Sequence, residues 1–186
     1  MTRHLWPALL AATVFIAGLA LAQTPAANPK VLLKTTMGDI TLELYPAKAP
    51  ITVKNFLTYV NDKFYDGTIF HRVIPNFMVQ GGGLTAEMTT KATKGTIKNE
   101  SGNGLLNARG SVAMARLQEL DSANSQFFIN VADNVSLDEM KYCVFAKVVS
   151  GMDVVDKIVA VPRGNRRGHG DVPLEPITIL SATVVK

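Results

Sequence analysis

The chain has 186 residues, a formal net charge of +4, 47% apolar residues and a single cysteine. This length suits one domain with a hydrophobic core of its own. The positive charge is small and dispersed, which argues against a nucleic-acid-binding protein, and one cysteine excludes an intrachain disulfide. The three histidines are scattered, and HExxH and paired CxxC motifs are absent. The sequence therefore predicts neither a metal site nor a cofactor.

The first residues are typical of a secretory signal peptide. Arg3 and His4 give a positive start, an apolar run follows over residues 5–21, and Ala20-Leu21-Ala22 is a small-x-small pattern. These features predict cleavage after position 22. The alternative is an uncleaved membrane anchor, for which the apolar run is short and carries Pro7 at its start. We expect three parts: a signal peptide (1–22), a flexible leader (23–30) and a folded domain (31–186).

The folded part begins with a strand pattern. Segments 31–36 and 40–44 flank Met37-Gly38-Asp39, which predicts a β-hairpin with glycine in its turn. In the second segment apolar and polar residues alternate, as in a half-buried antiparallel strand. From Pro50 the period changes, and the apolar positions 53, 56, 57 and 60 predict an amphipathic helix.

The remainder is predicted to be strands, with a second helix over 152–159 that Pro162 and Gly164 end. The long stretch 81–110 is expected to be an ordered surface loop, and the basic cluster of Arg163, Arg166 and Arg167 a solvated loop. Many short strands and two helices predict a mainly β fold, a closed eight-stranded antiparallel barrel capped by two α-helices. The remaining expected strands are 69–74, 78–80, 111–115, 127–131, 143–149 and 177–185.

Two segments combine large apolar side chains with a few polar ones. Residues 70–82 read FHRVIPNFMVQGG and residues 125–130 read SQFFIN. Alternation in a regular strand puts Phe70, Arg72 and Ile74 on one face and turns His71 away from Arg72, as a structural residue. Two such strands could bring Arg72 and glutamines together beside aromatic side chains.

These segments resemble the two signature segments of the cyclophilins, a family of peptidyl-prolyl cis/trans isomerases. The resemblance extends from about residue 31 to 184, and MAR at 114–116, FINVADN at 128–134 and SATV at 181–184 resemble the periplasmic cyclophilins of Gram-negative bacteria. It implies a folding catalyst for exported proteins in the periplasm, which acts as a monomer on proline-containing polypeptides. The alternative is a non-catalytic chaperone module that binds proline peptides.

The resemblance also implies roles for individual residues. Arg72 corresponds to the catalytic arginine that donates to the prolyl nitrogen, and Gln80 to its supporting glutamine. The other positions correspond to the substrate-binding walls and groove of the family: Phe77, Met78, Met114, Ala115, Arg116, Gln126, Phe128, Leu137 and Tyr142.

The chain departs from the family pattern at the rim of this site. Ser136 stands where an aromatic residue is usual, Tyr142 stands at the position of a histidine found in many members, and a longer loop follows Arg116. The tryptophan form of the first position helps to bind cyclosporin. We therefore expect weak cyclosporin binding.

Overall fold

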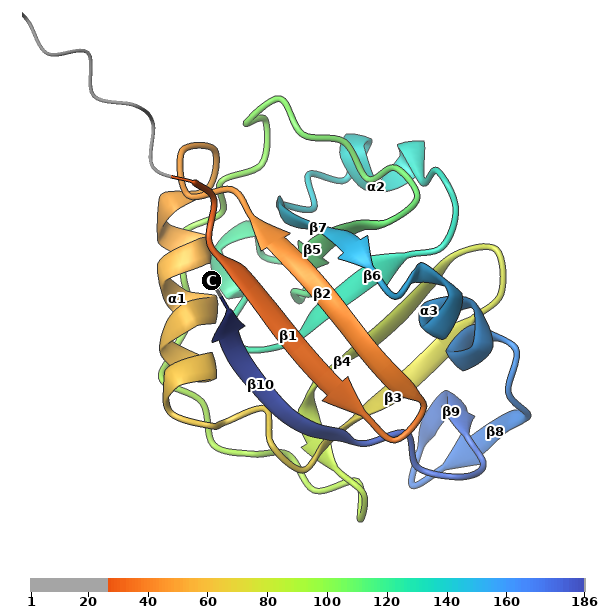
Figure 1. Cartoon of the computed structure of the whole chain (residues 1–186). Coiled ribbons are helices and arrows are strands. Elements are labelled where there is room, and N and C mark those ends of the chain that lie inside the picture. Colours follow the sequence, from red (N-terminus) through yellow and green to blue (C-terminus); the bar gives the residue numbers. More distant parts are fainter. Residues whose placement is uncertain (1–26, 186) are drawn as a thin grey trace, which may run out of the picture.

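The computed structural model describes residues 27–185 (Figure 1). The predicted signal peptide and half of the predicted leader, residues 23–26, lie outside these residues. No helix within 27–185 is long and apolar enough to cross a membrane. In chain order the elements are β1 (Lys30–Thr35), β2 (Gly38–Leu44), α1 (Pro50–Asn61), β3 (Thr68–Ile74), β4 (Met78–Thr85), β5 (Ser111–Met114), the 3-10 turn η1 (Leu120–Ser122), β6 (Phe127–Asn130), α2 (Val135–Glu139), β7 (Val144–Ser150), α3 (Met152–Val159), β8 (Arg163–Arg166), β9 (His169–Pro173) and β10 (Ile179–Val185).

Eight strands form one antiparallel sheet in the order β10-β1-β2-β7-β5-β6-β4-β3. The sheet curls until its two edges meet, where the Gly67 and Phe70 N–H groups donate to the carbonyls of Ile179 and Ile177. A single bridge, Ile69 to Thr178, joins the edges. The predicted eight-stranded, mainly β architecture is confirmed. The barrel is less closed than predicted, because only a few hydrogen bonds and one bridge join the edge strands β3 and β10.

The core lies inside the curl of the sheet. Ile40, Leu42 and Leu44 of β2 are fully buried, as the alternation predicted. Phe56 of α1 packs in the core on the ring of Phe127 at 5.5 Å, nearly edge to face. Aromatic pairs of this geometry add to the stabilisation that burial provides. The two predicted helices, α1 and α3, lie on opposite sides of the molecule (Figure 1), and both contribute residues to this one core.

The long connection between β4 and β5 is anchored to α1. Glu100 accepts hydrogen bonds from the backbone N–H groups of Ile51 and Thr52, at 3.0 and 2.8 Å. A carboxylate at this position satisfies first-turn donors and complements the helix dipole. Cys143 packs beside Thr52, and burial raises the pKa of its thiol. This connection is therefore an ordered loop, and the cysteine is a packed thiol, as predicted.

The 3-10 turn η1, helix α2 and the two strands β8 and β9 were not predicted. Helix α2 is only five residues long, too short for a periodic pattern to show. The basic segment at 163–167, predicted as a solvated loop, instead forms a two-stranded sheet, β8 with β9. Val172 of β9 joins a small buried cluster with Ile69, Leu84 and Met88. The hairpin is therefore attached to the barrel through a few apolar contacts that its polar sequence does not reveal.

Strand β3 contains a β-bulge at His71. Phe70 pairs with Gly81 and Arg72 pairs with Gln80, so His71 is an extra residue without a partner on β4. A bulge shifts the alternation of the strand by one residue. Phe70 therefore points into the core, whereas His71 and Arg72 both line the outer cavity. The expectations that Phe70 shares a face with Arg72, and that His71 points away from Arg72, are wrong for this reason.

The bulge leaves His71 in an unusual environment. Its side chain is 4% exposed, and its Nδ1 atom has no hydrogen-bond partner among the described residues. Burial, the nearby His169 imidazole and the Arg72 guanidinium lower the pKa of His71 to about 4, against a weaker opposing effect of the Ile69 backbone. The imidazole is therefore neutral at physiological pH.

We expect this histidine to make stability depend on pH. Its ordinary pKa is about 6.5, so between that value and about 4 the unfolded chain binds more protons than the folded one. Above pH ~6.5 the His71 imidazole is neutral in both states and costs no stability. As the pH falls from ~6.5 toward ~4, protonation of the unfolded chain lowers the free energy of unfolding by roughly 3 kcal/mol. His71→Gln should flatten this part of the curve of unfolding free energy against pH, measured by urea denaturation. The matched variant His169→Gln, at an exposed imidazole, should keep most of the slope, and an unchanged slope in His71→Gln would contradict the assignment.

Candidate active site

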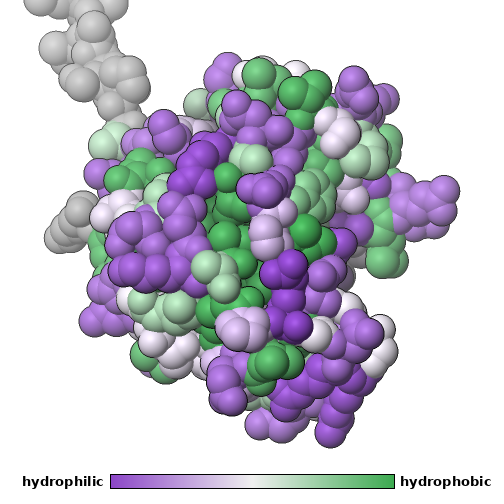
Figure 2. Space-filling model, turned by 90° about the vertical axis from the view of Figure 1, so that its right-hand side faces the viewer, coloured by the Kyte–Doolittle hydropathy of each residue, from purple (hydrophilic) through white to green (hydrophobic). Residues whose placement is uncertain are grey.

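One cavity of about 620 Å³ opens on the outer face of β3, β4 and β6. In Figure 2 apolar side chains gather in the middle of this side of the molecule, between polar surroundings. The cavity brings together ten of the residues that the sequence singled out: Arg72, Phe77, Met78, Gln80, Ala115, Arg116, Gln126, Phe128, Leu137 and Tyr142.

Met114 is the predicted site residue that does not line the cavity. Its side chain is 2% exposed and packs in the barrel core. Its N–H donates to the carbonyl of Cys143 at 3.1 Å. Because neighbouring strand residues point to opposite faces, Ala115 faces the cavity and Met114 cannot.

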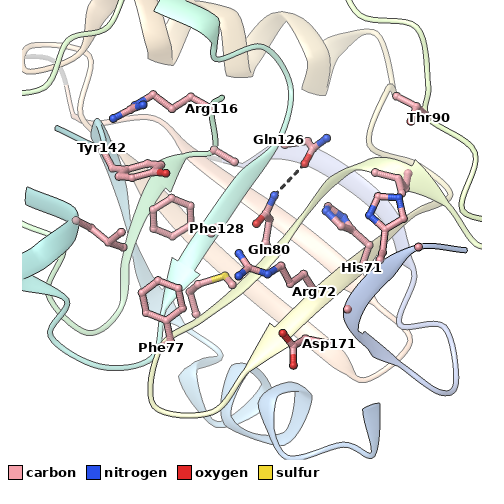
Figure 3. A pocket seen from close by; sticks show the side chains of 17 residues that line it. His71, Arg72, Phe77, Gln80, Thr90, Arg116, Gln126, Phe128, Tyr142 and Asp171 are labelled. Atoms are coloured by element: carbon pink, nitrogen blue, oxygen red, sulfur yellow. Dashed lines mark hydrogen bonds between the residues drawn. The ribbon is translucent and has the colours of Figure 1, made fainter. Parts of the chain in front are cut away.

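One end of the cavity is apolar. Met78, Phe128 and Leu137 belong to a buried cluster against which Phe77 and Tyr142 pack from the side. The rings of Phe128 and Tyr142 meet nearly edge to face, with centroids 5.7 Å apart. Figure 3 shows Phe77, Phe128 and Tyr142 around one pocket. Such a pocket binds a compact apolar group by excluding water from it.

Polar groups border this pocket on one side. The Gln80 Nε2 atom donates to Gln126 Oε1 at 2.9 Å, and the Arg72 side chain runs beside Gln80 with its guanidinium toward the pocket (Figure 3). Arg72 is exposed and forms no ion pair within residues 27–185. Its N–H donors are therefore available to a ligand in the pocket.

Gly83 makes room for the glutamine pair. A Cβ atom at this position would lie 2.5 Å from Cγ of Gln126 and 2.7 Å from its Nε2. Contacts this short do not occur, so a side chain at position 83 would displace Gln126. The glycine that follows the signature segment thus holds one wall of the site open.

A buried network of amide side chains fixes the walls of the apolar pocket. Asn134 Nδ2 donates to the carbonyl of Phe77 at 2.8 Å and to Asn130 Oδ1 at 2.6 Å. Asn130 in turn donates to Asn107 and Ser111. Buried amides of this kind are costly unless they are paired, and once paired they hold one geometry. The network therefore ties the β3–β4 turn to the segment that leads into α2, which carries Leu137.

The rim is held by Arg116, whose guanidinium carbon lies 4.5 Å from the centre of the Tyr142 ring. The same guanidinium donates to the carbonyls of Leu117 and Gln118, at 2.8 and 3.0 Å, and to that of Met140. Cation–π contact and several hydrogen bonds together fix this side chain. Arg116 therefore joins the loop before η1 to the end of α2.

Sequence reasoning missed two parts of the site. The first is the network of Asn107, Asn130 and Asn134, which an asparagine inside the apolar strand 127–130 could have signalled, since a buried amide needs partners. The second is the region around His71 and His169. No local pattern could have revealed it, because it depends on the bulge and on the distant β8–β9 hairpin.

Comparisons with known proteins agree with this geometry. The model of the family described as cyclophilin type peptidyl-prolyl cis-trans isomerase/CLD matches residues 30–184. A peptidyl-prolyl cis-trans isomerase of Acinetobacter baylyi is 53% identical over 92% of this chain and 93% of its own length. Peptidyl-prolyl cis-trans isomerase B of Escherichia coli is 55% identical over 83% of this chain and 98% of its own. The crystal structure of a cyclophilin-type isomerase of Cryptosporidium parvum superposes with a TM-score of 0.73 at 25% identity, over 86% of this chain and 98% of that one. The chain therefore belongs to the cyclophilin family and is a peptidyl-prolyl cis-trans isomerase.

Proposed function

We propose that this isomerase is a monomeric folding catalyst for exported, proline-containing proteins in the periplasm, and that Arg72 is its catalytic residue. The observation that carries the catalytic role is the Arg72 guanidinium, exposed and without an ion pair in the described part of the chain, at the border of an apolar pocket. The signal-like pattern of residues 1–22 supports export.

The chemistry of the X–Pro bond explains why these groups are sufficient. Resonance gives the C–N bond partial double-bond character, with a rotation barrier of ~18–20 kcal/mol. As the bond twists, resonance is lost and the nitrogen lone pair becomes an acceptor. No covalent bond breaks, so the reaction needs no nucleophile or general base. It needs a pocket that holds the ring and a donor aimed at the nitrogen.

The walls of the cavity divide these tasks. Phe77, Met78 and Phe128 hold the prolyl ring, while Gln80 and Gln126 present amide groups to the substrate backbone. Arg72 supplies the donor, since its guanidinium is always charged and presents several N–H groups in a planar fork. A hydrogen bond that strengthens only in the twisted state lowers the barrier rather than tightening binding of the substrate.

The same substrate class has been studied with a relative. A second structure of the Cryptosporidium parvum cyclophilin-type isomerase was determined in the presence of the dipeptide Ala-Pro, and it superposes on this chain with a TM-score of 0.72. This supports a proline-containing segment as the occupant of the apolar pocket.

Replacing Arg72 tests the catalytic role. Arg72→Ala should lower kcat/KM for a proline tetrapeptide by about 100- to 1,000-fold, the effect of losing one transition-state donor. Arg72→Lys keeps the charge without the planar fork, and its kcat/KM should lie between those of the wild type and Arg72→Ala. If Arg72→Ala isomerises as fast as wild type, Arg72 is not catalytic. If the wild type itself shows no acceleration but binds the peptide, the chain is a binding module.

Cyclosporin affinity tests the rim. Ser136 is exposed on α2, directly before the wall residue Leu137, and it offers little apolar area to a large cyclic ligand. Ser136→Trp should tighten cyclosporin binding by at least about tenfold, since a tryptophan at an interface supplies a large contact. Val135→Trp places the same side chain on the adjacent exposed position and should leave the affinity weak. Equal gains from both variants, measured by calorimetry, would show that position 136 has no special role.

Expression of the full chain in a Gram-negative host tests export. The isomerase should be recovered in the periplasmic fraction with a mass that begins at Gln23, as the small-x-small pattern predicts. Ala22→Phe puts a bulky residue at the predicted cleavage position and should leave a precursor at the membrane. Wild-type protein that keeps its first residues and stays in the cytoplasm would rule out the proposed location.

A further inference from the structure

The cavity continues past Arg72 into a second region, which we call the outer compartment. It is lined by His71, Leu84, Thr90 and the segment 168–171 of the β8–β9 hairpin. Figure 3 shows His71 and Thr90 on one side of Arg72 and Gln80, and Phe77 and Phe128 on the other. A prolyl ring held among the aromatic walls therefore leaves the outer compartment unoccupied.

A buried polar atom without a partner lies behind the lining of the outer compartment. His71 is 4% exposed and lines the cavity, yet its Nδ1 atom has no hydrogen-bond partner among residues 27–185. An unpaired buried polar group is costly, and native structures rarely keep one without a role. The His169 ring stands nearly perpendicular to it, with the centroids 6.4 Å apart. The His169 side chain is exposed, so its imidazole is open to this space and can donate a hydrogen bond.

The charges around this space are predominantly positive. Arg72 borders it, and the one carboxylate in its lining, Asp171, is already paired with Arg163 at 3.5 Å. Arg166 and Arg167 lie at the tip of the hairpin, opposite Glu87. The neighbouring Thr85 hydroxyl and, to a lesser extent, the charges of these two arginines lower the pKa of Glu87. This region of the surface therefore has more positive than negative side chains. It contains four arginines and two carboxylates: Arg72, Arg163, Arg166, Arg167, Asp171 and Glu87.

We propose that the outer compartment binds an acidic side chain of the substrate polypeptide, at a position flanking the proline. This inference rests on the isomerase function and names a substrate class for the same cavity. A carboxylate there accepts a hydrogen bond from the exposed His169 imidazole, and the surplus of arginines attracts its charge. A neutral glutamine has nearly the same shape but gains no Coulomb attraction, which makes the two residues a direct comparison.

The test measures kcat/KM for peptides that carry Glu or Gln at each of the positions around the proline. At low salt, one position should favour Glu over Gln by about threefold, the modest effect expected of exposed and weakly screened charge pairs. In the double variant Arg166→Ala/Arg167→Ala that ratio should fall toward one. The Glu/Gln ratio of kcat/KM is taken within each variant, because a substitution that slows both peptides equally leaves this ratio unchanged. The matched variant Lys54→Ala, an exposed cation on α1, should keep the wild-type ratio.

A binding measurement locates the effect. In NMR titrations, the Glu peptide should shift the imidazole signals of His71 and His169, and the Gln peptide should shift them less. A ratio near one at every position in the wild type would overturn the proposal, as would a preference that survives in the double variant. Failure to accelerate the reference Gln peptides would instead show that the isomerase function itself is wrong, so the two failures are distinguishable.

Discussion

The site depends on the register of β3 against β4, and above all on the bulge at His71. With regular pairing, Phe70 and Arg72 would lie on the same face, so either the core would lose an aromatic ring or the cavity would lose its arginine. The extra residue lets Phe70 pack against Phe127 in the core while Arg72 points outward. It also places His71 beside Arg72. In this position the buried Nδ1 atom of His71 has no hydrogen-bond partner among the described residues. A single backbone irregularity thus serves the core and both halves of the cavity.

The apolar pocket is rigid for a different reason. Its walls come from elements far apart in the chain, and short loops alone would let them move. The amide network of Asn107, Asn130 and Asn134 joins these elements inside the protein. Each bond is modest by itself, but a fully paired buried network permits only one arrangement. Rigid walls suit a reaction in which the enzyme must hold a ring still while the neighbouring bond rotates.

The two halves of the cavity differ in what they can recognise. The pocket at Phe77 and Phe128 is apolar and suits the ring of a proline. The outer compartment is polar, and its lining comes partly from the β8–β9 hairpin, which is attached to the barrel by a small apolar cluster. Under the two proposals made above, catalysis and substrate preference belong to different elements.

The sequence by itself determined the eight strands of the barrel, the two longer helices and most residues that line the cavity, because these depend on local alternation, helical periodicity and two distinctive segments. It could not determine where those residues point when pairing is irregular. The bulge turned Phe70 inward and His71 outward, and strand geometry put Met114 in the core rather than in the cavity. Short elements such as α2 and the β8–β9 hairpin carry too few apolar residues to show a period. Only tertiary contacts brought the hairpin to β3, and with it His169 to His71.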